Sequence, residues 1–245
     1  MKSLILAAGY ATRMYPLTLR TPKPLLDIAG RSIIDRLLDK LERTPGIDEC
    51  IVVSNGKFFD QFLAWSLGRR SAWPLVILND GSTDNENRLG AVADIRFAVR
   101  EKCINDDLLV LAGDNLFDFE LAGFAEFFRA RGCDCITTHR LDDAGKLRRT
   151  GVIEVDKDWN VISFEEKPSR PRSSLAVPPF YLYKKETLPL FAEYLEEGQN
   201  PDAPGNFIPW LLGLKPVAAY FFEGRRYDIG SLETYETIAR ACEWD

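Results

Sequence analysis

One stretch near the N-terminus determines how the rest of the chain is interpreted. Residues 6–26 read Leu-Ala-Ala-Gly-Tyr-Ala-Thr-Arg-Met-Tyr-Pro-Leu-Thr-Leu-Arg-Thr-Pro-Lys-Pro-Leu-Leu. Residues 3–7 form an apolar run that Gly9 ends, which is typical of a buried strand followed by a turn. Small residues in such a turn let backbone N–H groups approach phosphate oxygens, and Arg13 and Lys23 supply cations that can bind phosphate. No Gly-Lys-Ser/Thr follows, so the turn is not a Walker loop. On composition alone, a surface loop with two solvated cations is the simpler interpretation.

Strand and helix patterns alternate through the first 130 residues. Apolar runs between turn residues indicate strands, and apolar residues at helical spacing indicate helices. The expected strands are 3–7, 49–54, 75–78 and 108–112, and the expected helices are 32–41, 58–67, 89–99 and 121–130. This alternation favours a mostly parallel sheet with helices on both faces, in which ligands bind beyond the carboxyl ends of the strands. Residues 8–24 and 113–115 follow strands in this way.

The second half of the chain has a different pattern. Residues 151–156 and 161–165 are extended runs around a polar turn, which predicts a β-hairpin. The other expected elements are strands at 180–183 and 217–222 and helices at 187–195, 207–212 and 231–242. Ser231 would cap the last of these helices. No repeat, low-complexity stretch or linker interrupts the sequence, so we expect a single domain.

Composition excludes several classes of protein. The 245 residues are 46% hydrophobic and 28% charged, as in an ordinary globular protein. The apolar run at 4–8 is far shorter than the about 20 residues that span a bilayer, and it lacks the flanks of a secretory signal. We therefore expect a cytoplasmic protein that binds no membrane. The net charge of −6 is opposite to that of a general nucleic-acid binder. The five cysteines form no Cys-x-x-Cys pair and His139 is the single histidine, so reduced thiols are expected and a zinc site is not.

Residues 6–26 resemble the signature of the sugar-phosphate nucleotidyltransferases, Leu-Ala-x-Gly-x-Gly-Thr-Arg-Leu-x-Pro-Leu-Thr-x-x-x-Pro-Lys-Pro-Leu-Leu. Four further motifs similar to those of the family follow in order: Gly113-Asp114 after a strand, Thr150-Gly151-Val-Ile-Glu154, Ser163-Phe-Glu-Glu-Lys-Pro168 and Tyr227-Asp228-Ile-Gly-Ser-Leu-Glu-Thr-Tyr235. Taken singly, these motifs also fit a turn aspartate, an exposed charged run and a helix cap. Their order and spacing favour the family, and the resemblance covers nearly the whole chain.

The resemblance implies a fold and a division of the chain. The fold is α/β, a Rossmann-like three-layer αβα nucleotidyltransferase fold with a mostly parallel central sheet. A single nucleotidyltransferase domain would cover residues 1–245. Its nucleotide-binding part would comprise about residues 1–130 and its acceptor-binding part about 131–230, followed by the C-terminal helix at 231–242.

The resemblance also implies a reaction. A nucleoside triphosphate and a small phosphorylated acceptor, a sugar 1-phosphate or a phosphoalcohol, are joined with release of pyrophosphate. The acceptor phosphate is already ionised at neutral pH, so it needs no general base. The reaction instead requires alignment of two polyanions and neutralisation of charge at the α-phosphorus. Mg²⁺ is the implied cofactor. A homo-oligomer is left open.

The family motifs assign roles to individual residues. Arg13 and Lys23 would be catalytic, Arg13 holding the triphosphate and Lys23 lying near the α-phosphate. Asp114 and Asp228 would share the Mg²⁺ ion. The nucleotide would be contacted by Leu6, Ala7, Ala8, Gly9, Thr12, Arg13, Lys23, Ser82, Thr83, Asn85 and Asp114, and the acceptor by Gly151, Glu166, Lys167 and Tyr181.

Two departures from the family pattern affect the nucleotide side. Ala11 stands where most members have a second glycine, so either the loop has a slightly different shape or that position does not need a positive φ. Many members read the base with a glycine-rich segment, of which this chain keeps only Gly90-Ala91. Thr83-x-Asn85-x-x-x-Leu89 instead resembles the choline-phosphate cytidylyltransferase branch, and this favours CTP as the donor. The same residues also fit a polar loop whose Asn85 or Asn87 caps the next helix.

The residues expected on the acceptor side also depart from the family pattern. Residues 178–181, Pro-Pro-Phe-Tyr, replace a small-residue turn of sugar-specific members, which suits a smaller or non-sugar acceptor.

A catalytically silent paralogue that binds nucleotide sugar is the main alternative to an active enzyme, although the expected catalytic residues are present. A glycosyltransferase would show Asp-x-Asp, whereas this chain has Asp114-Asn115-Leu116. A dinucleotide oxidoreductase would show Gly-x-Gly-x-x-Gly.

Overall fold

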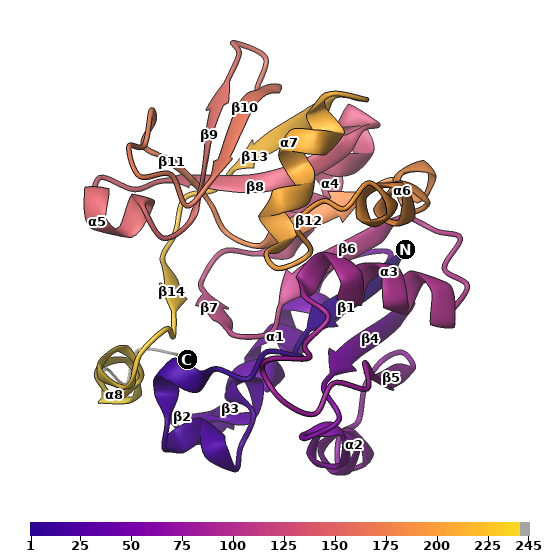
Figure 1. The fold of residues 1–245 in the computed structure, drawn as a ribbon, viewed down its shortest axis with the longest axis vertical. Helices are drawn as coiled ribbons and strands as arrows, with labels where there is room; N and C mark the ends of the chain where they lie inside the picture. Colours follow the sequence, from indigo (N-terminus) through magenta and orange to yellow (C-terminus); the bar gives the residue numbers. More distant parts are fainter. Residues whose placement is uncertain (241–245) are drawn as a thin grey trace.

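Ten strands form one central sheet in the computed structural model, which describes residues 1–240 (Figure 1). Their order across the sheet is β10-β9-β11-β8-β12-β6-β1-β4-β5, with β13 beside β8. These strands are β1 (Lys2–Leu6), β4 (Glu49–Ser54), β5 (Leu75–Asn79), β6 (Leu108–Ala112), β8 (Asp134–Arg140), β9 (Gly151–Val155), β10 (Val161–Glu166), β11 (Leu175–Val177), β12 (Phe180–Tyr183) and β13 (Val217–Phe221). Two separate pairs are β2 (Asp27–Ile28) with β3 (Arg31–Ser32), and β7 (Asn115–Phe117) with β14 (Arg226–Asp228).

The two halves of the sheet differ in strand direction. Strands β5, β4, β1 and β6 are parallel, and Leu6 at the end of β1 is in register with both Val53 and Ala112. Strands β12, β11, β9 and β10 pair antiparallel with their neighbours, and β13 runs parallel to β8. The predicted α/β fold class is thus confirmed. The strands of the first half of the chain form the parallel part, and most pairs that involve the second half are antiparallel, the β9–β10 hairpin among them.

Helices cover both faces of the sheet. The α-helices are α1 (Ile33–Glu42), α2 (Phe59–Leu67), α3 (Ala91–Glu101), α4 (Leu121–Arg131), α5 (Ala144–Leu147), α6 (Leu190–Glu196), α7 (Phe207–Leu212) and α8 (Leu232–Arg240). Successive side chains of β1 point to opposite faces. Leu4 joins the apolar cluster that includes α3, α6 and α7, and Ile5 joins the cluster that includes α1, α2 and α4. This is the expected three-layer arrangement. Within residues 1–240, none of the helices combines the length and the apolar character needed to cross a membrane.

The end of the described chain returns to its beginning. Strand β14 pairs antiparallel with β7, and α8 follows beside the N-terminal loop, as Figure 1 shows in yellow against indigo. Ile229 and Ile238 share an apolar cluster with Met14 and Ile28, and the Tyr235 hydroxyl donates to the Asp27 carbonyl at 2.7 Å. The C-terminal segment therefore closes one side of the loop that the family signature occupies.

Most expected elements are confirmed, and the differences have local causes. The expected strands at 49–54, 108–112 and 180–183 have the predicted bounds. The helix expected at 89–99 begins at Ala91, because Gly90 has φ 94° and ends the preceding loop. The helix expected at 187–195 begins at Leu190, after the 3₁₀ turn η4 (Lys185–Thr187). Ser231 caps α8, since its Oγ accepts the Thr234 N–H at 3.2 Å. Residues 241 and 242 of the expected terminal helix lie outside the described residues.

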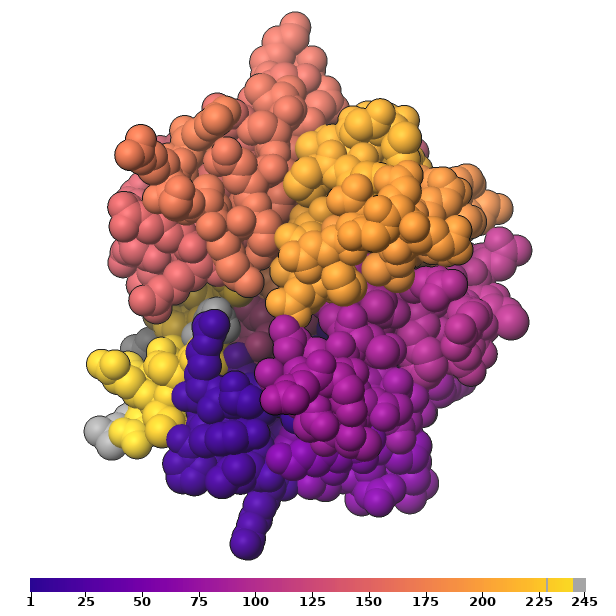
Figure 2. Space-filling view, viewed as in Figure 1, coloured from indigo at the N-terminus to yellow at the C-terminus, as the bar shows by residue number. Residues whose placement is uncertain are grey.

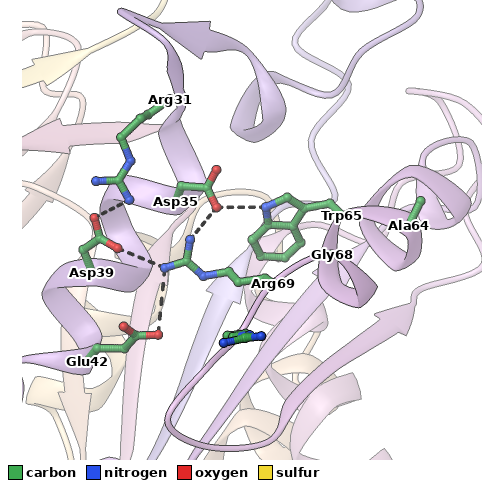
Figure 3. A pocket seen from close by; sticks show the side chains of 9 residues that line it. Arg31, Asp35, Asp39, Glu42, Ala64, Trp65, Gly68 and Arg69 are labelled. Atoms are coloured by element: carbon green, nitrogen blue, oxygen red, sulfur yellow. Dashed lines mark hydrogen bonds and ion pairs between the residues drawn. The ribbon is translucent and has the colours of Figure 1, made fainter.

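A hollow of about 600 Å³ lies between α1 and α2, away from the strand ends (Figure 3). Arg69 projects into it from the end of α2 and pairs with Asp35 at 2.7 Å and Asp39 at 3.0 Å. The Trp65 indole N–H donates to the same Asp35 oxygen at 3.0 Å. Burial raises the pKa of Asp35, but hydrogen bonds from Ser32 and Trp65 and the charge of Arg69 lower it below its ordinary value. The Arg69 guanidinium and the carboxylates of α1 pair with one another across the hollow. This ion-pair network therefore links α1 to α2.

We expect Arg69→Ala to lower the free energy of unfolding by about 2–3 kcal/mol, because Asp35 of this partly buried network loses its paired cation and Asp39 keeps only Arg31. Arg70→Ala is the matched control, since Arg70 is exposed beside the same hollow. Its effect should stay within about 0.5 kcal/mol. Urea unfolding of both variants measures this difference, and equal effects would show that the network does not hold α1 to α2.

Candidate active site

The family-signature residues gather at the carboxyl ends of the parallel strands. The Gly113 N–H donates to the Leu6 carbonyl at 2.9 Å, so the segments after β1 and β6 lie side by side. A side chain at Gly113 would come within 2.9 Å of Ile5 and 3.1 Å of the Leu6 carbonyl, so only glycine allows this approach. Figure 2 shows the surface recessed where the part coloured indigo to magenta meets the part coloured coral to orange. Strand ends of a parallel sheet are where ligands of such folds bind.

The turn after β1 is held by neighbouring strands and opens on one side. The Ala7 N–H donates to the Val53 carbonyl at 2.9 Å, and the Ala8 carbonyl accepts the Asn55 amide at 2.9 Å. No atom lies within 4 Å of the position that a side chain at Gly9 would take, so the turn faces open space there. Thr12 and Arg13 are exposed on the 3₁₀ turn η1 (Thr12–Met14). In the part of the chain described, no ion pair holds Arg13, and its side chain is not brought to Asp114.

Ala11 adopts the backbone conformation that favours glycine. Its φ and ψ are 46° and 43°, in the left-handed region. Its carbonyl accepts the Thr18 hydroxyl at 2.8 Å and the Met14 N–H at 2.9 Å, and these bonds keep the residue in place. The position therefore does need a positive φ, and the alanine tolerates it at a cost of about 1–2 kcal/mol.

Lys23 and Asp114 meet at the centre of the site. Lys23 is 7% exposed, and its Nζ donates to Asp114 Oδ2 at 2.7 Å. Lys23 is the first residue of the 3₁₀ turn η3 (Lys23–Leu25), and it lies between Pro22 and Pro24 in the sequence. Burial alone would raise the pKa of Asp114, but the Lys23 ammonium and the Arg226 guanidinium lower it below its ordinary value. Asp114 is therefore an ionised carboxylate at neutral pH, and 36% of its side chain is exposed.

Two residues that the sequence did not indicate complete this cluster. Asn115 is 3% exposed, and its amide N–H donates to Asp114 Oδ1 at 2.7 Å. The Arg226 Nε donates to the Asn115 amide oxygen at 2.6 Å. The β7–β14 pairing brings Arg226 to Asn115 across 111 residues of sequence, and no local pattern signals that contact. The arginine thus orients the amide that in turn orients Asp114.

The donor set at this point fits a magnesium ion. Asp114 supplies an ionised carboxylate that is partly open to solvent. The backbone of Asp228 pairs with Asn115, the residue next to Asp114, although the Asp228 side chain lies outside what the structure describes. Among the residues that the structure describes, no three histidine, cysteine, aspartate or glutamate side chains are grouped so that they could hold a metal ion by themselves. Mg²⁺ is commonly held by one or two carboxylates together with substrate phosphates and water, so these residues suit it.

The loop expected to read the base is largely bonded to itself. Ser82 is buried, and its hydroxyl lies 2.8 Å from Asp80 Oδ1 and 3.2 Å from the Tyr10 hydroxyl. The Asn87 side chain accepts the Thr83 N–H at 2.9 Å and donates to the Thr83 hydroxyl at 2.9 Å. Asn85 is exposed. Gly90 is the N-cap of α3, so neither Asn85 nor Asn87 caps that helix.

A buried acid lies at the start of α3. Asp94 is 5% exposed, and its Oδ1 has no hydrogen-bond partner among residues 1–240. Burial, with a contribution from the charge of Asp80, raises the pKa of Asp94 to about 8. Asp94 is therefore mostly protonated at neutral pH, and the sequence pattern of an amphipathic helix did not distinguish it from a solvent-facing aspartate.

The residues that the sequence predicts to contact the acceptor assemble at the open end of the β9–β10 hairpin. Gly151 and Glu166 are paired in register, and the Lys167 N–H donates to the Thr150 carbonyl at 3.2 Å. A side chain at Gly151 would lie 2.6 Å from Phe164, and one at Gly205 would overlap the Glu166 carboxylate. Burial raises the pKa of Glu166, and the nearby Lys167 ammonium partly offsets this.

Tyr181 lies beside this group but inside the core. It is 2% exposed, and its ring stacks on Tyr183 with centroids 5.9 Å apart. Burial raises the pKa of Tyr181 well above its ordinary value, and the charge of Glu166 adds to this effect. The neighbouring Phe180 faces the opposite side of the sheet and packs on Phe117 at 4.6 Å. Phe180 and Tyr181 therefore anchor β12 on both faces of the sheet, beside the residues that are expected to contact the acceptor.

Comparisons with known proteins identify the family and the fold of the chain. The sequence matches the family model described as nucleotidyl transferase over residues 2–243. A glucose-1-phosphate adenylyltransferase of Thermomicrobium roseum is 30% identical over 95% of this chain and 57% of its own length. A UTP–glucose-1-phosphate uridylyltransferase of Synechocystis sp. is 25% identical over 96% of this chain and 61% of its own. The chain thus spans about three-fifths of the length of these curated relatives. A structure of UDP-glucose pyrophosphorylase complexed with UDP-glucose has a TM-score of 0.81 and 20% identity, and the match covers 98% of this chain and 97% of that one, which shows the same fold.

We expect Ala11→Gly to raise the free energy of unfolding by about 0.5–1 kcal/mol. Glycine removes the left-handed strain at φ 46°, and part of that gain is offset by its greater freedom in the unfolded chain. Ala7→Gly is the control, because Ala7 has no positive φ and the change should destabilise by about 0.5–1 kcal/mol. Thermal unfolding of both variants tests this, and destabilisation by both would contradict it.

We expect Asp94→Asn to gain stability relative to the unchanged chain as pH rises from 5 to 8.5. With a pKa of about 8 in the folded state, Asp94 keeps a proton there that the unfolded chain has already released near pH 4. The stability of the unchanged chain therefore falls between pH 4 and 8, and asparagine removes this contribution.

Urea unfolding across that pH range measures the effect. Asp60→Asn, at an exposed position on α2, should change stability by the same small amount at every pH. Parallel pH profiles for Asp94→Asn and the unchanged chain would show that Asp94 titrates normally.

Proposed function

Because the chain belongs to the nucleotidyl transferase family, we propose that it joins a nucleoside triphosphate to a small phosphorylated acceptor and releases pyrophosphate. The observation that carries this proposal is the buried contact between Lys23 and Asp114 at the carboxyl ends of the parallel strands. A cation and an ionised carboxylate at this place supply the two charges that phosphoryl chemistry requires, one for the substrate and one for a metal. The relatives named adenylyltransferase and uridylyltransferase support the reaction class.

The reaction needs positioning and charge neutralisation from the protein. An oxygen of the acceptor phosphate attacks the α-phosphorus, and the bond from that phosphorus to the pyrophosphate oxygen breaks. Lys23 would neutralise charge that develops at the α-phosphate, and Arg13 would hold the triphosphate and the departing pyrophosphate. The open turn at Gly9 provides backbone N–H groups with no side chain in the way. Since the attacking phosphate is ionised, no general base is required.

Magnesium would be held by Asp114 and Asp228. When bound, Mg²⁺ supplies a positive charge that draws substrate phosphate oxygens into place and withdraws electron density from them. Both Asp114 oxygens accept hydrogen bonds in the structure, from Lys23 and Asn115. Asn115, fixed by Arg226, would keep the carboxylate in one orientation, and Lys23 would remain beside it to meet the substrate phosphate.

The donor and the acceptor are proposed from the loops at each end of the site. The polar loop with Thr83 and Asn85 supports CTP, because its hydroxyl and amide groups can satisfy both donor and acceptor edges of a pyrimidine. For the acceptor, the half-buried Glu166 carboxylate suits hydroxyl groups and Lys167 suits a phosphate. Both fit a sugar 1-phosphate, the substrate named for the curated relatives, or a smaller phosphoalcohol.

We expect thermal unfolding with Mg²⁺ and each of CTP, UTP, dTTP, GTP and ATP to show the largest stabilisation with CTP. A nucleotide at 100 times its dissociation constant adds about 2.7 kcal/mol. The same mixtures, with glucose 1-phosphate or choline phosphate added, should release pyrophosphate. A shift with another base alone would replace CTP as the donor, and nucleotide binding without turnover would favour a silent paralogue.

Variants separate catalysis from folding. Asp114→Asn and Lys23→Met should each lower turnover by about 10²–10³-fold, since each removes charge from the reacting centre. Circular dichroism and thermal unfolding report whether the fold is retained. Arg20→Ala removes an exposed cation of the same stretch and should change turnover by less than about twofold. Unchanged turnover in Asp114→Asn would reject the metal assignment.

A further inference from the structure

Two short stretches beside the acceptor residues concentrate positive charge. Residues 146–150 and 167–172 contain six of the 31 lysines and arginines of the chain and none of its 37 acidic residues. The whole chain has a net charge of −6, so this local excess is opposite to the average. Because like charges in a compact segment repel one another, such a cluster carries a cost unless an anion meets it.

The fold brings the two stretches together at the acceptor end of the site. The Lys167 N–H donates to the Thr150 carbonyl at 3.2 Å, and Gly151 and Glu166 pair directly. Helix α5 and the 3₁₀-like turn after it place Arg148 and Arg149 immediately before this pair. Figure 1 shows α5 on the same side as β11 and β14, next to the β9–β10 hairpin.

Four of these cations are held by no ion pair in the described chain, although the charge of Asp143 acts on Lys146 and Arg149 from a greater distance. Arg172 pairs with Glu165 at 3.5 Å, and Lys167 lies 3.6 Å from Glu166. Asp143 uses its carboxylate to accept the Lys146 backbone N–H at 3.0 Å and so caps α5. Four exposed cations form no ion pair within the described chain. They are Lys146, Arg148, Arg149 and Arg170, and we call them the cationic rim.

We propose that the acceptor carries a second anionic group, a carboxylate or a further phosphate, which the cationic rim binds. This inference rests on the proposed function. The attacking phosphate already has Lys167 and, at the reaction centre, Lys23, so one phosphate does not account for four more cations. Guanidinium groups bind carboxylate and phosphate through two parallel hydrogen bonds, and both kinds of anion therefore suit Arg148, Arg149 and Arg170.

The test compares three acceptors in the full chain with Mg²⁺ and the nucleotide that stabilises it most. Glucose 1-phosphate has one anionic group, glucose 1,6-bisphosphate adds a phosphate, and glucuronic acid 1-phosphate adds a carboxylate. We expect kcat/KM for one of the two doubly anionic acceptors to exceed that for glucose 1-phosphate on the order of tenfold. Which of the two is preferred identifies the second group.

A charge-reversed variant and a matched control locate the effect. Arg148→Glu with Arg149→Glu should abolish the tenfold preference and leave kcat/KM for glucose 1-phosphate within about threefold. Lys157→Glu makes the same kind of change at the opposite, exposed end of the same hairpin and should leave the preference intact. Raising the salt concentration from 50 to 300 mM should weaken the preference, because exposed charges are screened.

Calorimetric binding of the three acceptors to the nucleotide-loaded protein separates the two hypotheses. If nothing turns over but doubly anionic acceptors still bind more tightly, and the double variant removes this, the rim assignment stands and the proposed reaction fails. If glucose 1-phosphate is bound and used as well as the other two, the rim assignment is overturned. It is also overturned if Lys157→Glu acts like the double variant, or if the double variant lowers the use of all three acceptors equally.

Discussion

The candidate active site depends on one buried ion pair. A lysine that is only 7% exposed is costly unless a counter-charge meets its ammonium, and Asp114 does so at 2.7 Å. The two residues are 91 positions apart in sequence. Their contact requires β1 and β6 to lie next to each other, parallel and in register, with Gly113 small enough to approach Leu6. The sheet order is thus what places the signature loop opposite the aspartate.

Strand β14, near the end of the chain, contributes a further residue to the cluster around Lys23 and Asp114. Pairing of β14 with β7 carries Arg226 to Asn115 and through it orients Asp114. The same pairing places the backbone of Asp228 beside Asn115, the neighbour of the aspartate proposed to bind the metal. Helix α8 then packs on the loop that holds Lys23, so three segments distant in sequence share one small cluster. Disturbing any of them changes the environment of the same carboxylate.

Two of the five non-glycine residues that have a positive φ in the described chain lie at the two ends of the site. Ala11 in the turn after β1 and Lys167 at the end of β10 have φ values of 46° and 48°, which non-glycine residues adopt at a cost. Each is held by hydrogen bonds to a neighbouring segment, Ala11 through Thr18 and Lys167 through Thr150. These two residues lie where the nucleotide and the acceptor are proposed to bind, whereas Ala29, Cys103 and Trp159 have a positive φ elsewhere in the chain. The rigid sheet therefore fixes the conformation of the two loops.

The sequence by itself determined the fold class, the approximate positions of the main helices and strands, and the segments that carry the family motifs. Periodicity reports local burial, and the motif from Leu6 to Leu26, together with Gly113-Asp114 and residues 163–168, is continuous in sequence and can be recognised without coordinates. Only the tertiary structure decided that Ala11 takes the left-handed conformation, that Asn115 and Arg226 support Asp114, and that Asp94 is buried. It also brought residues 146–150 and 167–172 to one edge. These facts depend on contacts between segments far apart along the chain, and burial and charge pairing at such contacts leave no periodic trace in the sequence.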